Sequence, residues 1–334
     1  MLLLIRRRLA MLVLVLFGVS IVTFIMSHLI PGDPALALAG PRPTPELLHR
    51  LREQYGLNRP LWTQYAIYMR DLLQGDLGTS IRSQTPVTTD LFHFFPATLE
   101  LVLTAFIFAI IVGIPLGTYA AVKKDKFTDY IIRIFSIGGV SIPLFWGGLV
   151  MILIFYARLD WFPSSGRLSI EMNQPVHITG FFTIDTLLAG DFKAFFNALQ
   201  HLVMPALALG YVQLAFIVRQ VRSSMLEALS QDYYLMGRAN GLSNGFLIRR
   251  YALRNALIPS ITIIGLSFGS LLGGAVVTET IFDWPGMGKY VTESILSRDF
   301  PAIMGFTVVV AVAYVLINLI VDLLVYTLDP ETRR

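Results

Sequence analysis

The residues that perform covalent chemistry in enzymes are absent from this chain or do not form a recognisable site. There is no cysteine, which excludes thiolate nucleophiles, thiolate metal sites and disulfides. The five histidines form no paired metal-binding motif, and no Gly-x-Ser-x-Gly turn is present. The string Gly286–Tyr290 contains Gly-Lys but lacks the spacing and the hydroxyl residue of a phosphate-binding loop. We therefore expect no enzyme activity and no cofactor on this chain.

The polar stretch between residues 219 and 255 indicates recognition of a partner instead. A short helix is expected from about Ser230 to Leu242, with Asp232 near its positive N-terminal end and Tyr233 and Arg238 exposed. Gly241 would end this helix in the left-handed conformation that glycine adopts at little cost. The alternative, a basic loop that touches anionic lipid, remains open from these residues alone.

The composition places this stretch in a membrane protein. Of 334 residues, 55% are hydrophobic and 14% are charged, and the mean hydropathy is +0.65. Soluble domains average about 25% charged residues, so one soluble core cannot bury this much apolar surface. Disordered chains and disulfide-stapled secreted domains are excluded as well.

Six runs without a charged residue are long enough to cross a bilayer as helices. They are Leu9–Leu29, Leu101–Val122, Ile134–Ala157, Leu202–Val218, Ala256–Thr278 and Ala302–Val321. Their uniform apolarity argues against a transmembrane β-barrel. The first run could also be a cleaved signal peptide, but its 21 residues exceed the usual apolar core of such a peptide. We therefore predict an all-α fold with six transmembrane helices.

The distribution of charge orients these helices. With six spans both termini lie on one side, and that side has 15 Lys and Arg residues against 7 acidic ones. The opposite side has 11 basic and 15 acidic residues. The positive-inside rule therefore places both termini in the cytoplasm.

Two long segments, residues 30–97 and 160–200, fall on the external side. The first contains two expected short helices, Glu46–Tyr55 and Leu61–Leu73. Aromatic residues expected to be exposed on these segments are Trp62, Tyr65, Tyr68 and Trp161. The segments form either a folded cap that guides a solute inward or ordered loops with no ligand role, and the sequence leaves both open.

The fifth span contains a repeat of small residues. Gly265, Gly269 and Gly273 recur every four residues, so they share one helix face and allow another helix to approach closely. We expect helix packing to centre on this face.

Several motifs along the chain resemble those of one protein family. Residues 232–242 read Asp-Tyr-x-x-x-x-Arg-Ala-x-Gly-Leu, and further similar stretches are His28–Pro34, Gly75–Gly78, Phe95–Leu101 and Thr278–Gly288. With these motifs the whole chain resembles the inner-membrane permease subunits of ABC importers, in the dipeptide, oligopeptide and nickel branch. The external segment Phe162–Ala198 is similar to the first permease of dipeptide systems, including D,D-dipeptide members. Many relatives have Ala-Arg-Ala-Lys-Gly where this chain has Gly237–Gly241.

The resemblance implies a MetI-like type I importer permease fold. It implies an N-terminal helix (residues 1–29), an external helical insertion (30–93) and a five-helix transmembrane domain (94–328) that contains a cytoplasmic coupling loop (219–255). The residues that it assigns to ATPase coupling are Glu227, Asp232, Tyr233, Arg238, Ala239 and Gly241.

The resemblance also implies partners in a bacterial inner membrane. These are a second, homologous permease in a heterodimer, two ATPase subunits that bind ATP and Mg²⁺, an external solute-binding protein and membrane lipid, with no nucleic acid. The expected solute is a small peptide, and its contact residues are unknown. An ion-coupled secondary transporter or channel is the alternative, which the shortage of charge inside the spans disfavours.

Overall fold

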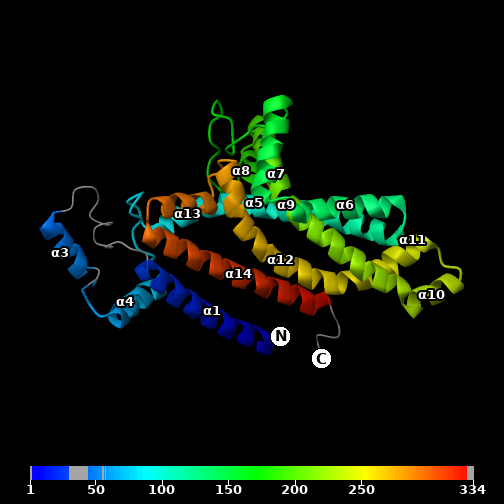
Figure 1. The fold of residues 1–334 in the computed structure, drawn as a ribbon, viewed down its shortest axis with the longest axis horizontal. Coiled ribbons are helices and arrows are strands. Elements are labelled where there is room, and N and C mark those ends of the chain that lie inside the picture. The colour runs from blue at the N-terminus through cyan, green and yellow to red at the C-terminus, as the bar shows by residue number, and fades with distance from the viewer. Residues whose placement is uncertain (1, 30–43, 55, 57, 329–334) are drawn as a thin grey trace. The chain divides into compact units, whose positions relative to one another are not determined.

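The computed structural model describes residues 2–29, 44–54, 56 and 58–328 (Figure 1). Its regular elements in these ranges are helices, and the only β-pairing there is an isolated bridge between Thr79 and Pro86. The all-α prediction is therefore confirmed. The chain divides into two compact units, residues 1–96 with 286–316 and residues 97–285 with 317–334.

The helices of the first unit include the two short ones expected in the external insertion. Its elements are α1 (Leu2–Leu29), α3 (Pro45–Gln54), α4 (Leu61–Leu73), the start of α5 (Val87–Val122), α13 (Met287–Leu296) and most of α14 (Phe300–Leu328). The second unit holds the rest of α5 and α14 together with the elements between them. These are α6 (Phe127–Ser141), α7 (Leu144–Met151), the π-helix η1 (Ile152–Arg158), α8 (Phe182–Leu188), α9 (Phe192–Ser230), α10 (Asp232–Ala239), α11 (Asn244–Leu247), the π-helix η2 (Ile248–Ala252) and α12 (Leu253–Ile281).

Among the described residues, four helices are long and apolar enough to cross a membrane. They are α5, α9, the stretch Asn244–Ile281 and α14 over Phe300–Leu323. A fifth span is present if α6 and the α7–η1 segment count as one, and α1 contains a shorter apolar stretch, Ala10–Met26. The prediction of six spans is compatible with this set.

The predicted third span, residues 134–157, is not a continuous helix. It is broken between Ser141 and Leu144, and the two halves are bent by 107° (Figure 1). Ile142 is extended, with φ −85° and ψ 121°, as expected for a residue that precedes proline. Pro143 has no N–H to donate and its ring clashes with a preceding helical turn, so the helix ends here.

α9 is the central helix of the second unit. It contacts α6, α7, α8 and α12, and it extends well beyond the predicted span 202–218 at both ends. Its first turn is capped by Asp191, whose carboxylate accepts a hydrogen bond from the N–H of Ala194 at 2.9 Å.

Close helix packing within the chain occurs where α5 crosses α9. A Cβ on Gly117 would lie 2.8 Å from the carbonyl oxygen of Val218, and a Cβ on Gly210 would lie 2.9 Å from that of Ala105. On the predicted glycine face of the fifth span, Gly265 is packed against Val321 of α14, whereas a Cβ added to Gly273 would meet no atom of another element within 4 Å. Within the second unit, α9 and α12, which contains the fifth span, pack against each other, so both helices contribute to its core.

In the first unit, α4 packs against α1. The ring of Phe24 lies 5.3 Å from that of Tyr65 and 6.0 Å from that of Tyr68, and the Tyr65 hydroxyl is 2.9 Å from Ser20 Oγ. Tyr65 and Tyr68 are therefore half-buried, contrary to the expectation that they are exposed, because they lie on the apolar face of an amphipathic helix. Trp62 is 75% exposed and Trp161 is 61% exposed, as predicted.

Candidate functional site

The polar stretch predicted to meet a partner forms a helical hairpin at the end of α9 (Figure 1). α9 ends at Ser230, and the extended backbone of Gln231, with φ −76° and ψ 150°, turns the chain into α10. Asp232 is the first residue of α10, where a negative charge interacts favourably with the helix dipole.

Gly241 ends this short helix. Its φ is +80°, the left-handed conformation predicted for this residue. The N–H of Gly241 donates to the carbonyl of Arg238 at 3.0 Å, and the N–H of Leu242 donates to the carbonyl of Gly237 at 3.2 Å. These two bonds form a Schellman motif, which satisfies carbonyls that the helix end would otherwise leave without a partner.

The inner face of α10 fixes its position against α11. Tyr234 is buried, and its hydroxyl donates to Asn244 Oδ1 at 3.2 Å. A Cβ on Gly237 would lie 2.5 Å from Leu247 Cδ2, so glycine at this position lets α10 lie directly on α11. Gly237 therefore has a packing role.

All six residues that the sequence assigned to coupling are solvent-exposed. Asp232, Tyr233, Arg238 and Ala239 lie on α10, Gly241 follows it, and Glu227 lies on the last turns of α9. Sequence reasoning missed two exposed apolar residues on the same helix, Leu235 (51% exposed) and Met236 (68% exposed). Helix periodicity could have revealed both residues. Tyr234 and Gly237 are one turn apart on the same helix face, so the residues between them must point outward.

We refer to the exposed residues of α10, together with Glu227 and Gly241, as the α10 surface. It combines charges of both signs with apolar side chains on one short helix. A surface of this kind resembles the mixture found where proteins bind proteins, whereas an anionic lipid headgroup selects mainly basic residues.

Buried contacts join the α10 surface to the transmembrane helices. Tyr234 and Leu247 belong to one hydrophobic core cluster with Met225 of α9 and Ala256 of α12. Nearby, Arg222 of α9 donates two hydrogen bonds of 2.7 Å to the carboxylate of Asp129 on α6, which is fully buried. α10 itself contacts α9 and α11, so packed groups on those two helices resist a displacement of α10, and the Arg222–Asp129 pair ties α9 to α6.

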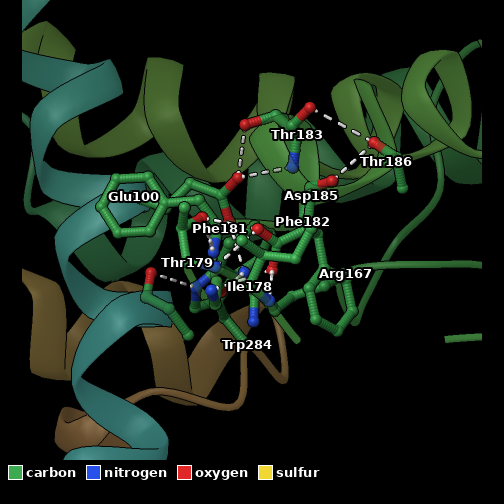
Figure 2. Close-up of polar contacts among 12 residues, drawn as sticks. Glu100, Arg167, Ile178, Thr179, Phe181, Phe182, Thr183, Asp185, Thr186 and Trp284 are labelled. Carbon is green, nitrogen blue, oxygen red and sulfur yellow. Dashed lines mark hydrogen bonds and ion pairs between the residues drawn. The ribbon is translucent and has the colours of Figure 1, made fainter. Parts of the chain in front are cut away.

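A second polar cluster organises the segment predicted to be external (Figure 2). Glu100 on α5 accepts hydrogen bonds from the N–H and hydroxyl of Thr183 at 2.9 and 2.6 Å, and its carboxylate pairs with Arg167 at 2.5 Å. The Arg167 guanidinium also lies 3.7 Å from the centre of the Phe182 ring. These contacts fix the loop before α8 against α5.

Asp185 stabilises the same loop from its interior (Figure 2). Its carboxylate accepts hydrogen bonds from the N–H groups of Thr179 and Gly180, both at 2.8 Å, and from the Thr179 hydroxyl at 2.6 Å. Burial alone would raise the pKa of Asp185, but these hydrogen bonds outweigh it and hold the pKa below its ordinary value. The loop is therefore a folded structure built around an ionised carboxylate.

No group of three or more His, Asp or Glu residues able to hold a metal ion occurs in the part of the chain that the structure describes. The two clusters offer binding surfaces and structural ties.

Comparison with known proteins covers nearly the full length of the chain. Residues 113–334 match the family described as binding-protein-dependent transport system inner membrane component, and residues 1–104 match its N-terminal region family. The chain is 53% identical over 329 residues to the probable D,D-dipeptide transport system permease protein DdpB of Escherichia coli, covering 98% of this chain and 97% of the relative. It is 44% identical to the dipeptide transport system permease protein DppB of Alkalihalophilus pseudofirmus, covering 98% of each chain.

A solved structure shares the fold at low sequence identity. A chain of the MetNI methionine ABC transporter in an inward-facing conformation superimposes with a TM-score of 0.53 at 17% identity. The match covers 72% of this chain and 96% of that chain. The helical arrangement is therefore one already seen in a membrane transporter.

Proposed function

Because the chain belongs to the family of binding-protein-dependent transport system inner membrane components, we propose that it forms half of the pathway through which an ATP-driven importer moves dipeptides. Membership of the family confirms that the chain is an importer permease. It excludes the alternative function, an ion-coupled secondary transporter or channel. It also makes the chain a multi-pass inner-membrane protein.

The proposed solute is a dipeptide, with D,D-dipeptides as the first class to test. Support comes from the relatives, since the one that is 53% identical is a probable D,D-dipeptide permease and others at 42–44% are dipeptide permeases. The glutathione permease GsiC is less similar, at 34% identity.

The proposed assembly contains a second, homologous permease, two ATPase subunits and an external binding protein. ATP and Mg²⁺ would be bound by the ATPases, and this chain would hold no cofactor. Gly273 of α12 has open space around it, which supports a close approach by a helix of the second permease. Both termini and α10 would face the cytoplasm, and residues 30–93 and 160–200 would face the binding protein.

The α10 surface is the observation that most supports energy coupling through this chain. It combines an exposed mixed surface with a buried inner face whose core cluster includes residues of α9 and α12. An ATPase that closes around ATP and binds this surface would move α10, and packed contacts would pass the movement to the bundle.

Reconstitution tests the function. We would co-express the chain with its partner subunits, place the complex in proteoliposomes with the binding protein, and measure uptake of D-alanyl-D-alanine and of L-alanyl-L-alanine. We expect uptake of at least one peptide with ATP and none with a non-hydrolysable analogue. Uptake that proceeds equally without ATP, or that is absent for both peptides in an intact complex, would contradict the proposal.

The variant Ala239→Glu distinguishes a role of α10 in ATPase coupling from a role in folding. The longer, charged side chain adds bulk on the exposed face of α10, so we expect normal membrane levels but loss of both ATPase co-purification and uptake. The matched control is Ser223→Glu, which places the same side chain on the exposed face of α9. A variant complex that keeps its ATPases and transports normally would refute the coupling role.

A further inference from the structure

A cavity of about 290 Å³ opens at the break in the third span. Its lining comes from three parts of the second unit. The break contributes Ile142, Pro143 and Leu144, α9 contributes Leu209 and Gln213, and α12 contributes Ser270. Its volume lies near the lower end of the range for small-molecule binding sites.

The backbone at the break is unusual for a membrane-spanning segment. Polar backbone groups outside a helix are tolerated at that depth only where they are buried in protein or line a hydrated cavity. α7 begins at Leu144 directly after Pro143, and no side chain caps this end of the helix. The first N–H groups of α7 therefore lack partners within the helix, and they lie at the positive end of its dipole.

Gln213 supplies the second, independent feature of the cavity. It is only 4% exposed and lines the cavity from the middle of α9. The Ser267 hydroxyl donates its proton to the carbonyl of Ile264 at 2.6 Å, so Ser267 Oγ can only accept from Gln213 Nε2. This fixes the orientation of the amide and leaves Gln213 Oε1 with no donor among the described residues.

We propose that this cavity is a subsite where the transported peptide is held by its backbone. The C-terminal carboxylate would bind the N–H groups at the start of α7, and an amide or ammonium N–H of the peptide would donate to Gln213 Oε1. The apolar lining, such as Leu209, would contact the small side chains. This inference rests on the proposed function and adds to it the residues that touch the solute.

The unpaired groups select a peptide over the other possible occupants. A lipid acyl chain has neither a donor for Gln213 nor an anionic group for the start of α7. A neighbouring transmembrane helix already uses its own backbone N–H groups internally, so only one of its polar side chains could donate to Gln213, and that donor would not also supply an anionic group for the start of α7. A short peptide with a free carboxylate supplies both.

The absence of cysteine allows a direct test in the full complex. We would introduce Ser270→Cys, whose position is exposed to the cavity, and measure labelling by a small anionic methanethiosulfonate during ATP-driven transport. D-alanyl-D-alanine and L-alanyl-L-alanine should each slow the labelling severalfold if transported, and their C-terminal amides should not. Leu266→Cys, one turn away and outside the cavity lining, is the control and should show no protection.

Gln213→Leu provides an independent variant of similar size. We expect about tenfold slower uptake, corresponding to the loss of one hydrogen bond, while the complex still assembles. Gln220→Leu is the matched control, since it makes the same change on α9 outside the cavity lining and should transport normally. If Gln213→Leu does not assemble, the labelling of Ser270→Cys decides the question.

The outcomes separate this inference from the proposed function. If the wild-type complex takes up neither peptide with ATP, the proposed function fails. If uptake is normal but the peptide does not protect Ser270→Cys, the subsite is wrong. Labelling of Ser270→Cys only by a membrane-soluble maleimide would show that lipid fills the cavity, and failure to label with either reagent would show that protein covers it; each result overturns the inference.

Discussion

Two glycines on the α10 hairpin have different physical reasons to be glycine. Gly241 has open space around it but a φ of +80°, so a substitution there is limited by backbone conformation. Gly237 lies in the middle of α10, and a Cβ there would collide with Leu247. Substitutions at the two positions should therefore damage α10 in different ways.

The Gly241 cap can be tested with residues that differ in their tolerance of the left-handed conformation. Gly241→Val should destabilise the end of α10 by about 1–2 kcal/mol, because a β-branched residue is strained at positive φ. Gly241→Asn should cost much less, since asparagine tolerates this conformation. Hydrogen exchange of the α10 amides measures the difference, and equal exchange in both variants would show that the cap does not stabilise the helix.

The buried carboxylate of Asp185 should make the stability of its loop depend on pH in a defined way. Its pKa in the folded state lies below the ordinary value of about 3.9, so its stabilising effect is complete above pH 4 and is lost as the pH falls through the folded pKa. Hydrogen exchange of residues 178–186 should therefore be steady from pH 7 to pH 5, after correction for intrinsic rates, and rise below pH 4.

Asp185→Asn isolates this carboxylate at neutral pH. It should raise exchange of the loop at pH 7 by an amount equivalent to about 1–3 kcal/mol and remove most of the pH dependence. Asp160→Asn, at an exposed aspartate of the same segment, serves as the control. A loop that exchanges identically in wild type and Asp185→Asn would refute the structural role of the carboxylate.

Some of these side-chain roles could be predicted from the sequence and others could not. Gly241 was predictable because a helix end and its cap are neighbours in the chain. The pairing of Glu100 with Arg167 joins residues 67 positions apart, and no local pattern indicates which of the chain's charges meet. The exposure of Tyr65 and Tyr68 was misjudged because the partner helix, α1, lies about 40 residues earlier in the chain.

Among the helices, sequence patterns located apolar segments better than they described their shape. The runs that gave α5, α9, α12 and α14 were correctly identified, because apolar composition is a property of the segment itself. The break at Ser141–Leu144 was missed even though Pro143 was visible within the run. Proline does not always break a membrane helix, so the 107° bend depends on the surrounding helices as well.

The crossing of α5 over α9 gives a prediction about helix packing. Gly117→Ala places a methyl group 2.8 Å from the Val218 carbonyl oxygen and should destabilise the complex by about 1–3 kcal/mol. Gly18→Ala in α1, where an added Cβ meets nothing within 4 Å, is the control and should be neutral or slightly stabilising. Thermal unfolding in detergent compares them, and equal melting temperatures would contradict the assignment of the close contact to α5 and α9.

Across the whole molecule, α9 links the two activities proposed here, solute binding and ATPase coupling. Its middle presents Gln213 to the cavity at the broken span, and its end leads into α10 and the ATPase-docking face that we propose there. The membrane class and the family were apparent from composition and motifs. The cavity was not, because it is lined by three segments that are far apart in the sequence.

Docking of the ATPase on α10 is tested most directly by identifying the protein that touches α10 in the assembled complex. We would introduce Met236→Cys into the cysteine-free chain, attach a benzophenone maleimide, illuminate the membranes and identify the cross-linked product. Lys126→Cys, an exposed position preceding α6, is the control. We expect an adduct with the ATPase subunit from Met236→Cys and much less from Lys126→Cys. An intact, ATP-hydrolysing complex in which Met236→Cys forms no ATPase adduct would contradict this docking.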